Sequence, residues 1–339
     1  MGRRATAQDV ADLAGVSRSA VSLVLNGRAK GVISAVKQEA VLDAARRLEY
    51  TPNAVAQSLR TSRTRILGVL TWRGVGGLPL HLMAGALQTS LDHGYKLIKM
   101  YADPTELDQR RALSTLGNQQ VDGMLVVAPE LCEYEPVEAL ASSPAVLLNC
   151  QDPGQRITGV VPDEEGAGRA AVEVLLERGH RDIALLSGPL DHFQTGLRAA
   201  GAVQALRAAG MRPRQLAADD LRIDEGLAAA AALLTAERPP TALVCTNERL
   251  AVGVVLAAAR LGLSVPEDLS LVSLDDREQL SAQLAPELTR VERPDDLMAS
   301  HAAGLLINWV ESGVEPGAHA YSFVCPLVEG ASVAGPRGT

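Results

Sequence analysis

Residues 6–27, TAQDVADLAGVSRSAVSLVLNG, carry the signals of two short helices joined by a tight turn. Thr6 and Asp9 form a capping pattern, in which a hydroxyl and a carboxylate satisfy the unpaired amides at the start of a helix. Gly15 stands where that helix ends, and Ser17 can cap a second helix after a turn of three residues. The stretch therefore predicts a helix-turn-helix unit.

The second helix has an apolar face and a mainly polar face. The apolar face consists of Ala20, Val21, Val24 and Leu25, and the outer face carries Arg18, Ser19, Ser22, Leu23 and Asn26. Such a helix has the geometry that seats a recognition helix in the major groove of DNA. We therefore expect Arg18 to read a guanine edge or to bind a phosphate. Leu23 is either a contact to a thymine methyl group or an exposed surface leucine.

A third helix is predicted from residue 34 to about residue 48. Its inward-facing residues, which would close a three-helix core, are Val41, Ala44, Ala45 and Leu48. Pro52 then prevents the residue before it from continuing a helix. Residues 53–60, NAVAQSLR, have a helical composition, but eight residues are too few for a stable isolated helix in water. We expect this segment to become ordered only against a partner.

Charge is distributed unevenly along the 339 residues. Residues 1–65 contain 11 Lys and Arg against 5 Asp and Glu, a net charge of +6, whereas the remaining residues contain 21 against 35, a net charge of −14. A basic head on an acidic body indicates that only the head meets a polyanion. A solvated basic helix pair would also give this asymmetry, so charge alone does not establish DNA binding.

The motif TAQDVADLAGVSRSAVSLVLNG, followed by TPNAVAQSLR, resembles the headpiece and hinge helix of the LacI/GalR family of bacterial regulators. The resemblance implies that the hinge helices of two protomers pair on DNA and that Leu59 wedges into the minor groove and kinks the site. Leu23 stands where the family commonly has Arg, and Lys37 follows Val36 where Thr-Arg is usual. These departures concern the operator sequence and not the mode of binding.

The candidate DNA-binding residues come from the headpiece and from the hinge. They are Thr6, Ser17, Arg18, Ser19, Ala20, Leu23, Asn26, Asn53, Ala56, Gln57, Leu59 and Arg60.

From Ile66 onward, short apolar runs alternate with longer amphipathic stretches, which is typical of βαβ units around a parallel sheet. Strands are predicted at residues 66–70, 95–101, 121–127, 145–148, 182–187, 241–245 and 269–274, and helices at 164–178, 195–209 and 247–261. These strands exceed one sheet, so two doubly wound lobes are expected, with a ligand in the cleft between them.

The resemblance continues through residues 168–189, 240–276 and 286–294. It implies two lobes of the periplasmic-binding-protein type I architecture, with the chain crossing between them near residues 160, 290 and 325. The expected fold is thus an N-terminal all-α helix-turn-helix headpiece followed by a two-lobed α/β effector domain. The expected domains are residues 1–50 (headpiece), 51–64 (hinge helix and linker), 65–328 (ligand binding and dimerisation) and 329–339 (flexible tail).

Three residues of the second lobe, Arg198, Asn247 and Asp275, match family positions that bind the polar groups of an effector. Each has a plainer alternative, since an Asn at a helix start is often a cap and an Asp at a strand end is often a turn residue. Weaker candidates for the effector site are Asp163, His192 and Gln194. Aromatic residues make up 3% of the chain, so no platform for ring stacking is evident. The resemblance implies a polar, hydroxylated effector such as a sugar.

Other classes of protein fit the sequence less well. An NAD-dependent oxidoreductase is suggested by Gly74, Gly76 and Gly77 with Asp103, but Pro79 replaces the third glycine of the fingerprint. An exported solute-binding protein would need a signal sequence, and the N-terminus MGRRATAQDV has no apolar region of that kind. A hydrolase would need a GxSxG elbow, which Ser187-Gly188 does not supply.

The sequence thus predicts a non-enzymatic, DNA-binding transcriptional regulator, a repressor, that needs no cofactor. Its expected partners are a pseudo-palindromic double-stranded DNA operator, a small-molecule effector and a second copy of the chain. No run of apolar residues is long enough for a membrane helix, and we expect a cytoplasmic location. The four cysteines lie far apart, so we expect them to be buried small hydrophobes and not ligands of a metal.

Overall fold

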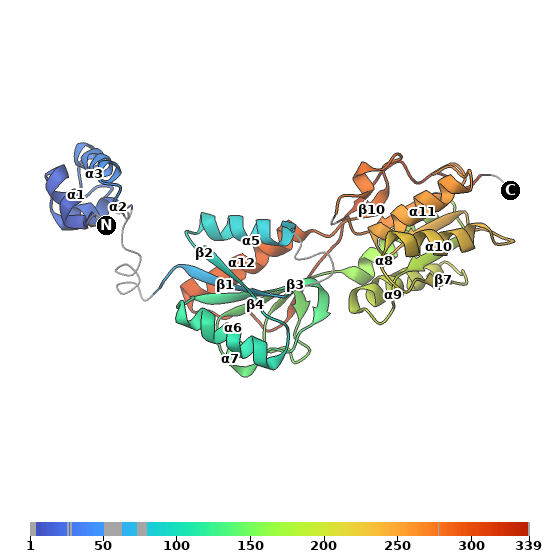
Figure 1. Ribbon diagram of the computed structural model, residues 1–339, viewed down its shortest axis with the longest axis horizontal. Helices are drawn as coiled ribbons and strands as arrows, with labels where there is room; N and C mark the ends of the chain where they lie inside the picture. Colours follow the sequence, from blue (N-terminus) through green and yellow to red (C-terminus); the bar gives the residue numbers. More distant parts are fainter. Residues whose placement is uncertain are drawn as a thin grey trace. The chain divides into compact units, whose positions relative to one another are not determined.

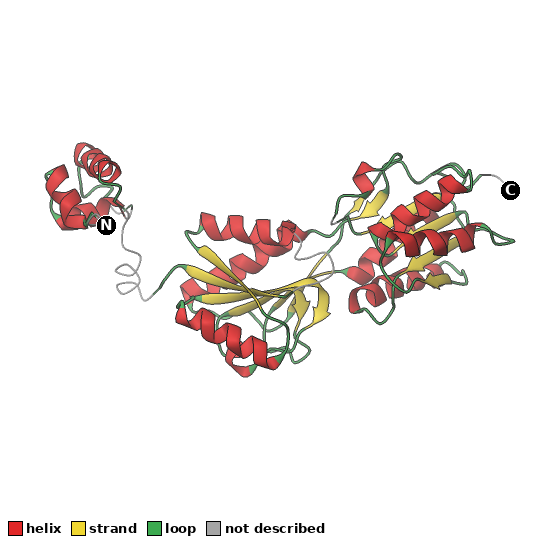
Figure 2. Ribbon diagram, viewed as in Figure 1, coloured by secondary structure: helices red, strands yellow, loops and turns green. Residues whose placement is uncertain are grey.

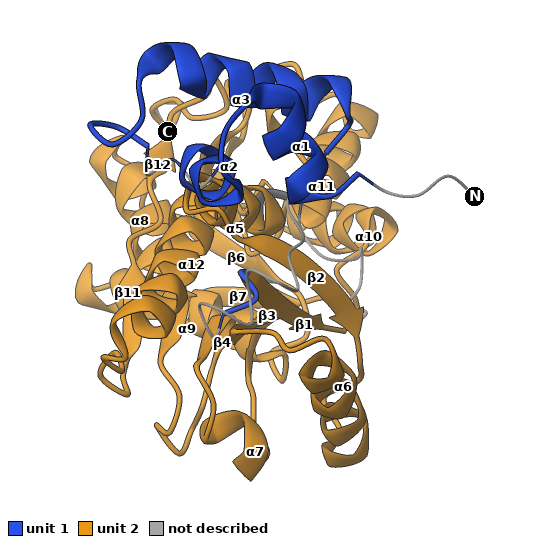
Figure 3. Ribbon diagram, turned by 90° about the vertical axis from the view of Figure 1, so that its left-hand side faces the viewer, with its two compact units in different colours: residues 1–65 blue, residues 66–339 orange. Residues whose placement is uncertain are grey.

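The computed structural model describes residues 5–25, 27, 29–50, 63–72, 80–276 and 278–337. The chain divides after Arg65 into two compact units, residues 1–65 and residues 66–339, which Figure 3 distinguishes by colour. Each unit has a hydrophobic core of its own. Within the described residues, no helix is long and apolar enough to cross a membrane.

The first unit is a bundle of three helices, α1 (Ala7–Ala14), α2 (Arg18–Leu25) and α3 (Ala35–Arg47). The predicted capping box is present, because the Asp9 amide donates to Thr6 Oγ1 and the Thr6 amide donates to an Asp9 carboxylate oxygen. Gly15, in the left-handed conformation with φ of 63°, ends α1 as predicted. The core joins Val10, Val21 and Val41, one from each helix, all at most 1% exposed.

The helical spacing of α2 predicted that Leu23 faces solvent, and this prediction is wrong. The side chain is half-buried and packs against the three-helix core. The helix is short and packs against both α1 and α3, so more than one stripe of it is covered. Leu23 therefore contributes to the packing of the unit, whatever else it contacts.

The second unit contains two lobes, each built on a six-stranded sheet (Figures 1 and 2). In lobe 1 the strand order is β11-β5-β4-β3-β1-β2, and in lobe 2 it is β12-β10-β9-β8-β6-β7. Every pairing is parallel except that of β10 with β12. The strands of lobe 1 are β1 (Ile66–Thr71), β2 (Lys96–Tyr101), β3 (Gly123–Glu133), β4 (Ala145–Gln151), β5 (Gly159–Pro162) and β11 (Ala320–Phe323). The strands of lobe 2 are β6 (Ile183–Ser187), β7 (Arg214–Ala217), β8 (Ala242–Cys245), β9 (Ser270–Leu274), β10 (Thr289–Val291) and β12 (Leu327–Val328).

Helices cover both faces of each sheet, which explains why the central strands are apolar on both sides. In lobe 1, α5 (Leu80–Asp92) and α12 (Asp295–Ser312) share a core on one face, and α6 (Glu106–Asn118) and α7 (Glu138–Ala141) share a core on the other. In lobe 2, α8 (Glu164–Glu177) and α9 (Phe193–Ala208) cover one face, and α10 (Ile223–Leu234) and α11 (Glu248–Arg260) cover the other. A short 3-10 helix, η1 (Ser281–Gln283), follows β9.

The chain crosses between the lobes three times, as predicted. It passes from β5 to α8 after Pro162, from β10 to α12 after Val291, and from β11 to β12 after Phe323. The strands β5, β7, β10, β11 and β12 were not predicted. Each has only two to four residues, which is too short for a clear apolar pattern.

The prediction of a flexible tail from residue 329 onward is wrong for residues 329–337. Ser332 is fully buried, and its hydroxyl accepts from the Thr289 amide (2.8 Å) and donates to the carbonyl of Leu271 (2.5 Å). His180 Nε2 lies 2.8 Å from the carbonyl oxygen of Ala334. The segment satisfies polar groups of lobe 2, which a composition rich in Gly and Pro did not reveal.

Glycines allow α8 and α9 to pack at close range. A Cβ on Gly168 would overlap the carbonyl oxygen of Arg198, and a Cβ on Gly201 would overlap the carbonyl oxygen of Glu165. Only a residue without a side chain fits at these two crossing points. This close approach brings side chains near the start of α8 within reach of those on α9.

We expect Gly168→Ala to lower the free energy of unfolding by about 1–3 kcal/mol, because the added methyl group must push α8 away from α9. The matched control is Gly304→Ala in α12, where a Cβ would meet nothing within 4 Å. That substitution should stabilise the protein by about 0.5–1 kcal/mol, since glycine is unfavourable inside a helix. Urea unfolding of both variants measures the difference. Equal stability of the two would contradict the close packing.

Candidate functional site

The outer face of α2 presents polar side chains to solvent. Ser17, Arg18, Ser19 and Ser22 are all exposed, whereas Ala20 is half-buried. Ser17 Oγ also accepts a hydrogen bond from the Ala20 amide (3.2 Å), so the predicted cap of the second helix is present. The first turn of α2 therefore offers a cation and hydroxyl groups on a rigid helix, which is a suitable surface for reading DNA.

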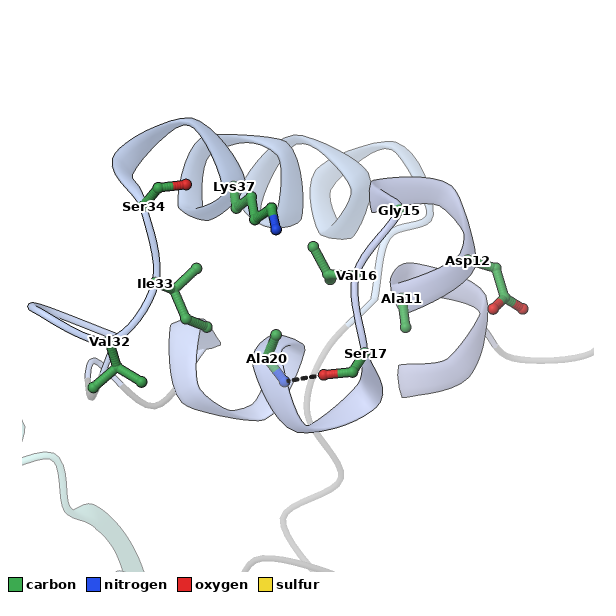
Figure 4. A pocket seen from close by; sticks show the side chains of 10 residues that line it. All are labelled: Ala11, Asp12, Gly15, Val16, Ser17, Ala20, Val32, Ile33, Ser34 and Lys37. Atoms are coloured by element: carbon green, nitrogen blue, oxygen red, sulfur yellow. Dashed lines mark hydrogen bonds between the residues drawn. The ribbon is translucent and has the colours of Figure 1, made fainter.

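A hollow of about 700 Å³ lies beside this helix, between the turn that joins α1 to α2 and the start of α3. Lys37 extends from α3 toward the hollow, and Ser17 and Ser34 stand on either side of it (Figure 4). Ser34 is the N-cap residue of α3, but its side chain makes no capping hydrogen bond. A helix N-terminus with a lysine and two hydroxyl groups is suited to an anionic oxygen. In the sequence, Lys37 stands out only as a departure from the family pattern.

Several predicted residues cannot be placed. Asn26, Asn53, Ala56, Gln57, Leu59 and Arg60 lie outside the described residues, as do the glycines 74, 76 and 77 of the dehydrogenase alternative. Thr6 is described, and its hydroxyl is engaged in the cap of α1, where it also donates to Asp9 Oδ2 (2.7 Å).

In the second unit, a pocket of about 520 Å³ is lined by both lobes. Lobe 1 contributes Trp72, at the end of β1, and residues 129–132 of β3 and its bulge. Lobe 2 contributes residues 192–195, Arg198, Leu221, Thr246 and Asn247. Four of the six predicted effector residues, His192, Gln194, Arg198 and Asn247, therefore line one pocket.

Arg198 is the centre of a buried hydrogen-bond network. Its Nε donates to Glu164 Oε2 (2.6 Å), and its Nη2 donates to Glu164 Oε1 (3.0 Å) and to Asp275 Oδ2 (3.4 Å). Nη1 donates to the carbonyl oxygen of Thr246 (2.8 Å). Burial alone would lower the pKa of Arg198, but the charges of Glu164 and Asp275 raise it above its usual value. The guanidinium therefore stays charged and holds α9 to α8 and to the end of β9.

Glu164 was missed in the sequence because it was counted only as the first residue of a predicted helix. It is 1% exposed, and Oε1 also accepts from Gln194 Nε2 (2.5 Å). Its partner Arg198 is 34 positions away, so no local pattern marks the pair. The two acidic residues that begin α8 differ in this respect, since Glu165 is exposed.

Three of the predicted effector residues, Asn247, Asp163 and Asp275, have structural roles. Asn247 caps α11, where Oδ1 accepts from the Arg249 amide (2.8 Å). Asp163 caps α8 in the same way, accepting from the Gly166 amide (2.8 Å), and it is not among the residues that line the pocket. Asp275, with φ of 75°, is buried, is not among the residues that line the pocket, and accepts from Arg198. The plainer alternatives considered for Asn247 and Asp275 are therefore part of their roles.

A second arginine extends the charged cluster toward the crossing between β10 and α12. Arg293 Nη2 lies 2.6 Å from Asp295 Oδ1, and both side chains are at most 6% exposed. Arg293 Nη1 is buried and has no hydrogen-bond partner among the described residues. Burial would lower the pKa of Arg293, but Asp295, Asp275 and Glu164 raise it.

The loop after Asp275 is anchored by a buried acid, Glu248, at the start of α11. Its carboxylate accepts from the amides of Glu278 (2.8 Å) and Leu280 (3.2 Å). Burial raises the pKa of Glu248 to about 7, although the two amides act in the opposite direction.

Two expectations about side-chain chemistry need correction. The pocket does contain aromatic rings, because Trp72 lines it from lobe 1 and Phe193 from lobe 2. Cys132 is half-buried and lines the pocket, whereas Cys150, Cys245 and Cys325 are buried. Burial, with the neighbouring Glu130 and Glu133, raises the pKa of Cys132 to about 11, so it remains a thiol at neutral pH. A low overall aromatic content did not reveal where the few rings lie.

Comparison with known proteins matches both units. The model for bacterial regulatory proteins of the lacI family matches residues 6–53, and the model for a periplasmic binding protein-like domain matches residues 172–333. The HTH-type transcriptional repressor PurR of Edwardsiella ictaluri is 32% identical over 314 residues, which cover 91% of each chain. The PurR repressor of Vibrio atlanticus is 32% identical over 316 residues, 91% of this chain and 92% of that protein. The chain belongs to the LacI family of bacterial regulatory proteins.

Solved structures of LacI-family proteins share the fold. The lac repressor dimer bound to operator and the anti-inducer ONPF has a TM-score of 0.76 at 27% identity, covering 98% of this chain and all of that one. The complex of the transcriptional regulator CelR with cellobiose has a TM-score of 0.65 at 26% identity, covering 97% and 100%. The predicted fold class and the prediction of a LacI-family transcriptional regulator are thus confirmed.

In this LacI-family chain, we expect Arg198→Met to lower the free energy of unfolding by about 3–5 kcal/mol, because it leaves the buried Glu164 and Asp275 without their cation. Adding Glu164→Gln should restore about 0.5–3 kcal/mol, since one of the two stranded charges is then removed. Denaturant unfolding of the two single variants and the double variant measures this coupling. Strictly additive losses would contradict the ion pair.

Proposed function

We propose that this LacI-family chain is a transcriptional repressor that binds a pseudo-palindromic operator as a homodimer. The observation that carries the proposal is the exposed outer face of α2, with Arg18, Ser19 and Ser22 on a helix held by a compact three-helix core. One such helix covers only a half-site, so two protomers are needed for a full site. Arg18 is the base reader in this proposal, because its planar fork matches the acceptors of guanine.

The hollow beside α2 is proposed to hold a phosphate of the DNA backbone. Lys37 supplies a positive charge there, and Ser17 and Ser34 supply hydroxyl donors. Contacts to phosphate fix the register of a protein on DNA and do not themselves read the sequence. The hinge residues Asn53, Ala56, Gln57, Leu59 and Arg60 are proposed as minor-groove and backbone contacts from the family resemblance.

The pocket between the lobes is proposed as the effector site, with His192, Gln194, Arg198 and Asn247 in its wall and Asp163 and Asp275 in support. Its effector is a sugar or a related polar metabolite, which the chain binds without transforming it. A ligand controls DNA affinity only if it favours one arrangement of the lobes over another. The chain acts where its operator is, in the cytoplasm.

Selection of bound sequences from a random DNA pool tests the proposed function directly. The full chain should select a two-fold symmetric site, because the two half-sites are related by the symmetry of the dimer. A chain that lacks residues 1–65 should remain folded, since residues 66–339 form a compact unit, and should select nothing. Retained sequence-specific binding by that shorter chain would contradict the domain assignment.

The contributions of Arg18 and Lys37 are expected to differ in kind. Arg18→Ala should cost about 1–3 kcal/mol of discrimination at one base pair of each half-site. Lys37→Gln should weaken binding to all sequences alike and lower the slope of log affinity against log salt by about 0.9 for each phosphate that is no longer neutralised. Arg47→Gln is the control, because Arg47 pairs with Asp43 (2.8 Å) at the far end of α3. Salt titrations that show the same slope for Lys37→Gln and the wild type would contradict the phosphate site.

Light scattering at micromolar concentration should give a mass of about twice 35.6 kDa. A monomer that still binds a full two-fold site tightly would refute the proposed homodimer.

A further inference from the structure

The arginine in the pocket wall has little hydrogen-bonding capacity left for a ligand. Four hydrogen bonds join the Arg198 guanidinium to Glu164, Thr246 and Asp275. A guanidinium carries five N–H donors, so these contacts within the described part of the chain leave one, on Nη1. Arginine binds a carboxylate or a phosphate through two parallel N–H groups. Arg198 can therefore meet a single acceptor atom of a ligand, but it cannot form a fork with an acid.

Glu164 occupies the position that an acidic ligand would take. Its two oxygens accept from Nε and Nη2 of Arg198, which is the two-point geometry of a bound carboxylate. The hydrogen bond from Gln194 and the complete burial of the Glu164 carboxylate hold it there. The protein itself thus supplies the anion that neutralises its pocket arginine.

The charge around the pocket also opposes an acid. In the described part of the chain, the ion pairs around Arg198 and Arg293 include the carboxylates of Glu164, Asp275 and Asp295. Glu130 adds a further carboxylate to the wall on the side of lobe 1. An additional negative charge next to Arg198 would be repelled by these described carboxylates. Hydroxyl and amino groups of a ligand would instead find an acceptor in Glu130.

Two aromatic rings line the same pocket from opposite lobes. The Trp72 ring stacks on Tyr134, with 5.6 Å between ring centroids and an interplanar angle of 8°, and Tyr134 is buried. This stacking fixes the plane of Trp72. Phe193, at the first position of α9, lines the pocket from lobe 2. Aromatic rings in a pocket wall favour ring-shaped ligands, and they also attract cations.

We propose that the effector is a ring compound with hydroxyl or amino groups and no negative charge, and that Glu164 excludes acids from the pocket by occupying Arg198. This inference rests on the proposed function, because it takes the pocket between the lobes as the effector site. The ring contacts Trp72 and Phe193, one acceptor atom meets Arg198 Nη1, and the ligand's donors face Glu130. Carboxylated and phosphorylated forms of the same compound are rejected.

Compounds that differ only in charge test the proposal on the full chain without DNA. One set is glucose, glucosamine, glucuronate and glucose 6-phosphate, a second is adenosine and its 5′-monophosphate, and inorganic phosphate is the bare anion. Binding is followed by the fluorescence of Trp72 in a Trp309→Phe background and by thermal unfolding. Glu164→Gln preserves the size of the side chain and removes its charge. Glu165→Gln makes the same change on the next, exposed residue and is the matched control.

We expect the wild type and Glu165→Gln to bind the acids and phosphate at least about tenfold more weakly than the uncharged or amino compounds, or not at all. Glu164→Gln should bind the acids or phosphate at least about tenfold more tightly than the wild type does, because the buried negative charge is removed and the single amide oxygen can no longer accept from both Nε and Nη2 of Arg198. Glu164→Ala, which also empties the position beside Nε and Nη2 of Arg198, is the second variant and should show the same gain.

The proposal is overturned if the wild type binds an acid as tightly as its uncharged counterpart. It is also overturned if the Glu164 variant gains no affinity for any acid or for phosphate. Failure of the proposed function is a separate result. A chain that selects no DNA sequence contradicts the proposed role as a transcriptional regulator. The charge preference of the pocket is measured without DNA and does not depend on that outcome.

Discussion

The ion pair between Glu164 and Arg198 links the parts of lobe 2 on which the pocket depends. It joins the first turn of α8 to the middle of α9, and through Asp275 it reaches the end of β9. Burying two charges costs several kcal/mol per ion, which only short, multiple hydrogen bonds can offset. Here the offset depends on the close contact of the two helices at Gly168 and Gly201. The packing of α8 against α9 and the Glu164–Arg198 ion pair therefore depend on each other, because a wider spacing of the two helices would separate the two charges.

The same cluster lies where the chain passes between the lobes. Glu164 follows Pro162, the last residue of β5 in lobe 1, and the Arg293–Asp295 pair lies between β10 of lobe 2 and α12 of lobe 1. Two of the three crossings therefore carry charges that interact with Arg198. A change of lobe arrangement must act on these connecting segments. A ligand next to Arg198 is consequently well placed to favour one arrangement of the lobes, because Arg198 interacts with charged residues at two of the crossings.

Local patterns could be predicted from the sequence, and contacts between distant residues could not. The Thr6–Asp9 cap and the buried strand β1 follow from residues that are near one another in the chain, and both were predicted correctly. The partners of Arg198 lie 34, 48 and 77 positions away. The sequence therefore identified Arg198 as a candidate ligand contact but did not show which residues of the protein already bind it. The packing of Ser332 against Leu271 was hidden for the same reason.

The contacts of Arg198 with distant residues change how this candidate for ligand binding is interpreted. A sequence shows that an arginine is available, but its chemistry depends on what already binds it, because a guanidinium with its donors engaged no longer behaves as an anion receptor. Truncating Arg198 would strand two buried carboxylates, so the loss of ligand response in such a variant would be mixed with a loss of stability. Changing Glu164 to a neutral residue of the same size avoids that ambiguity. It leaves the arginine in place and removes the buried negative charge that competes with an acid for it.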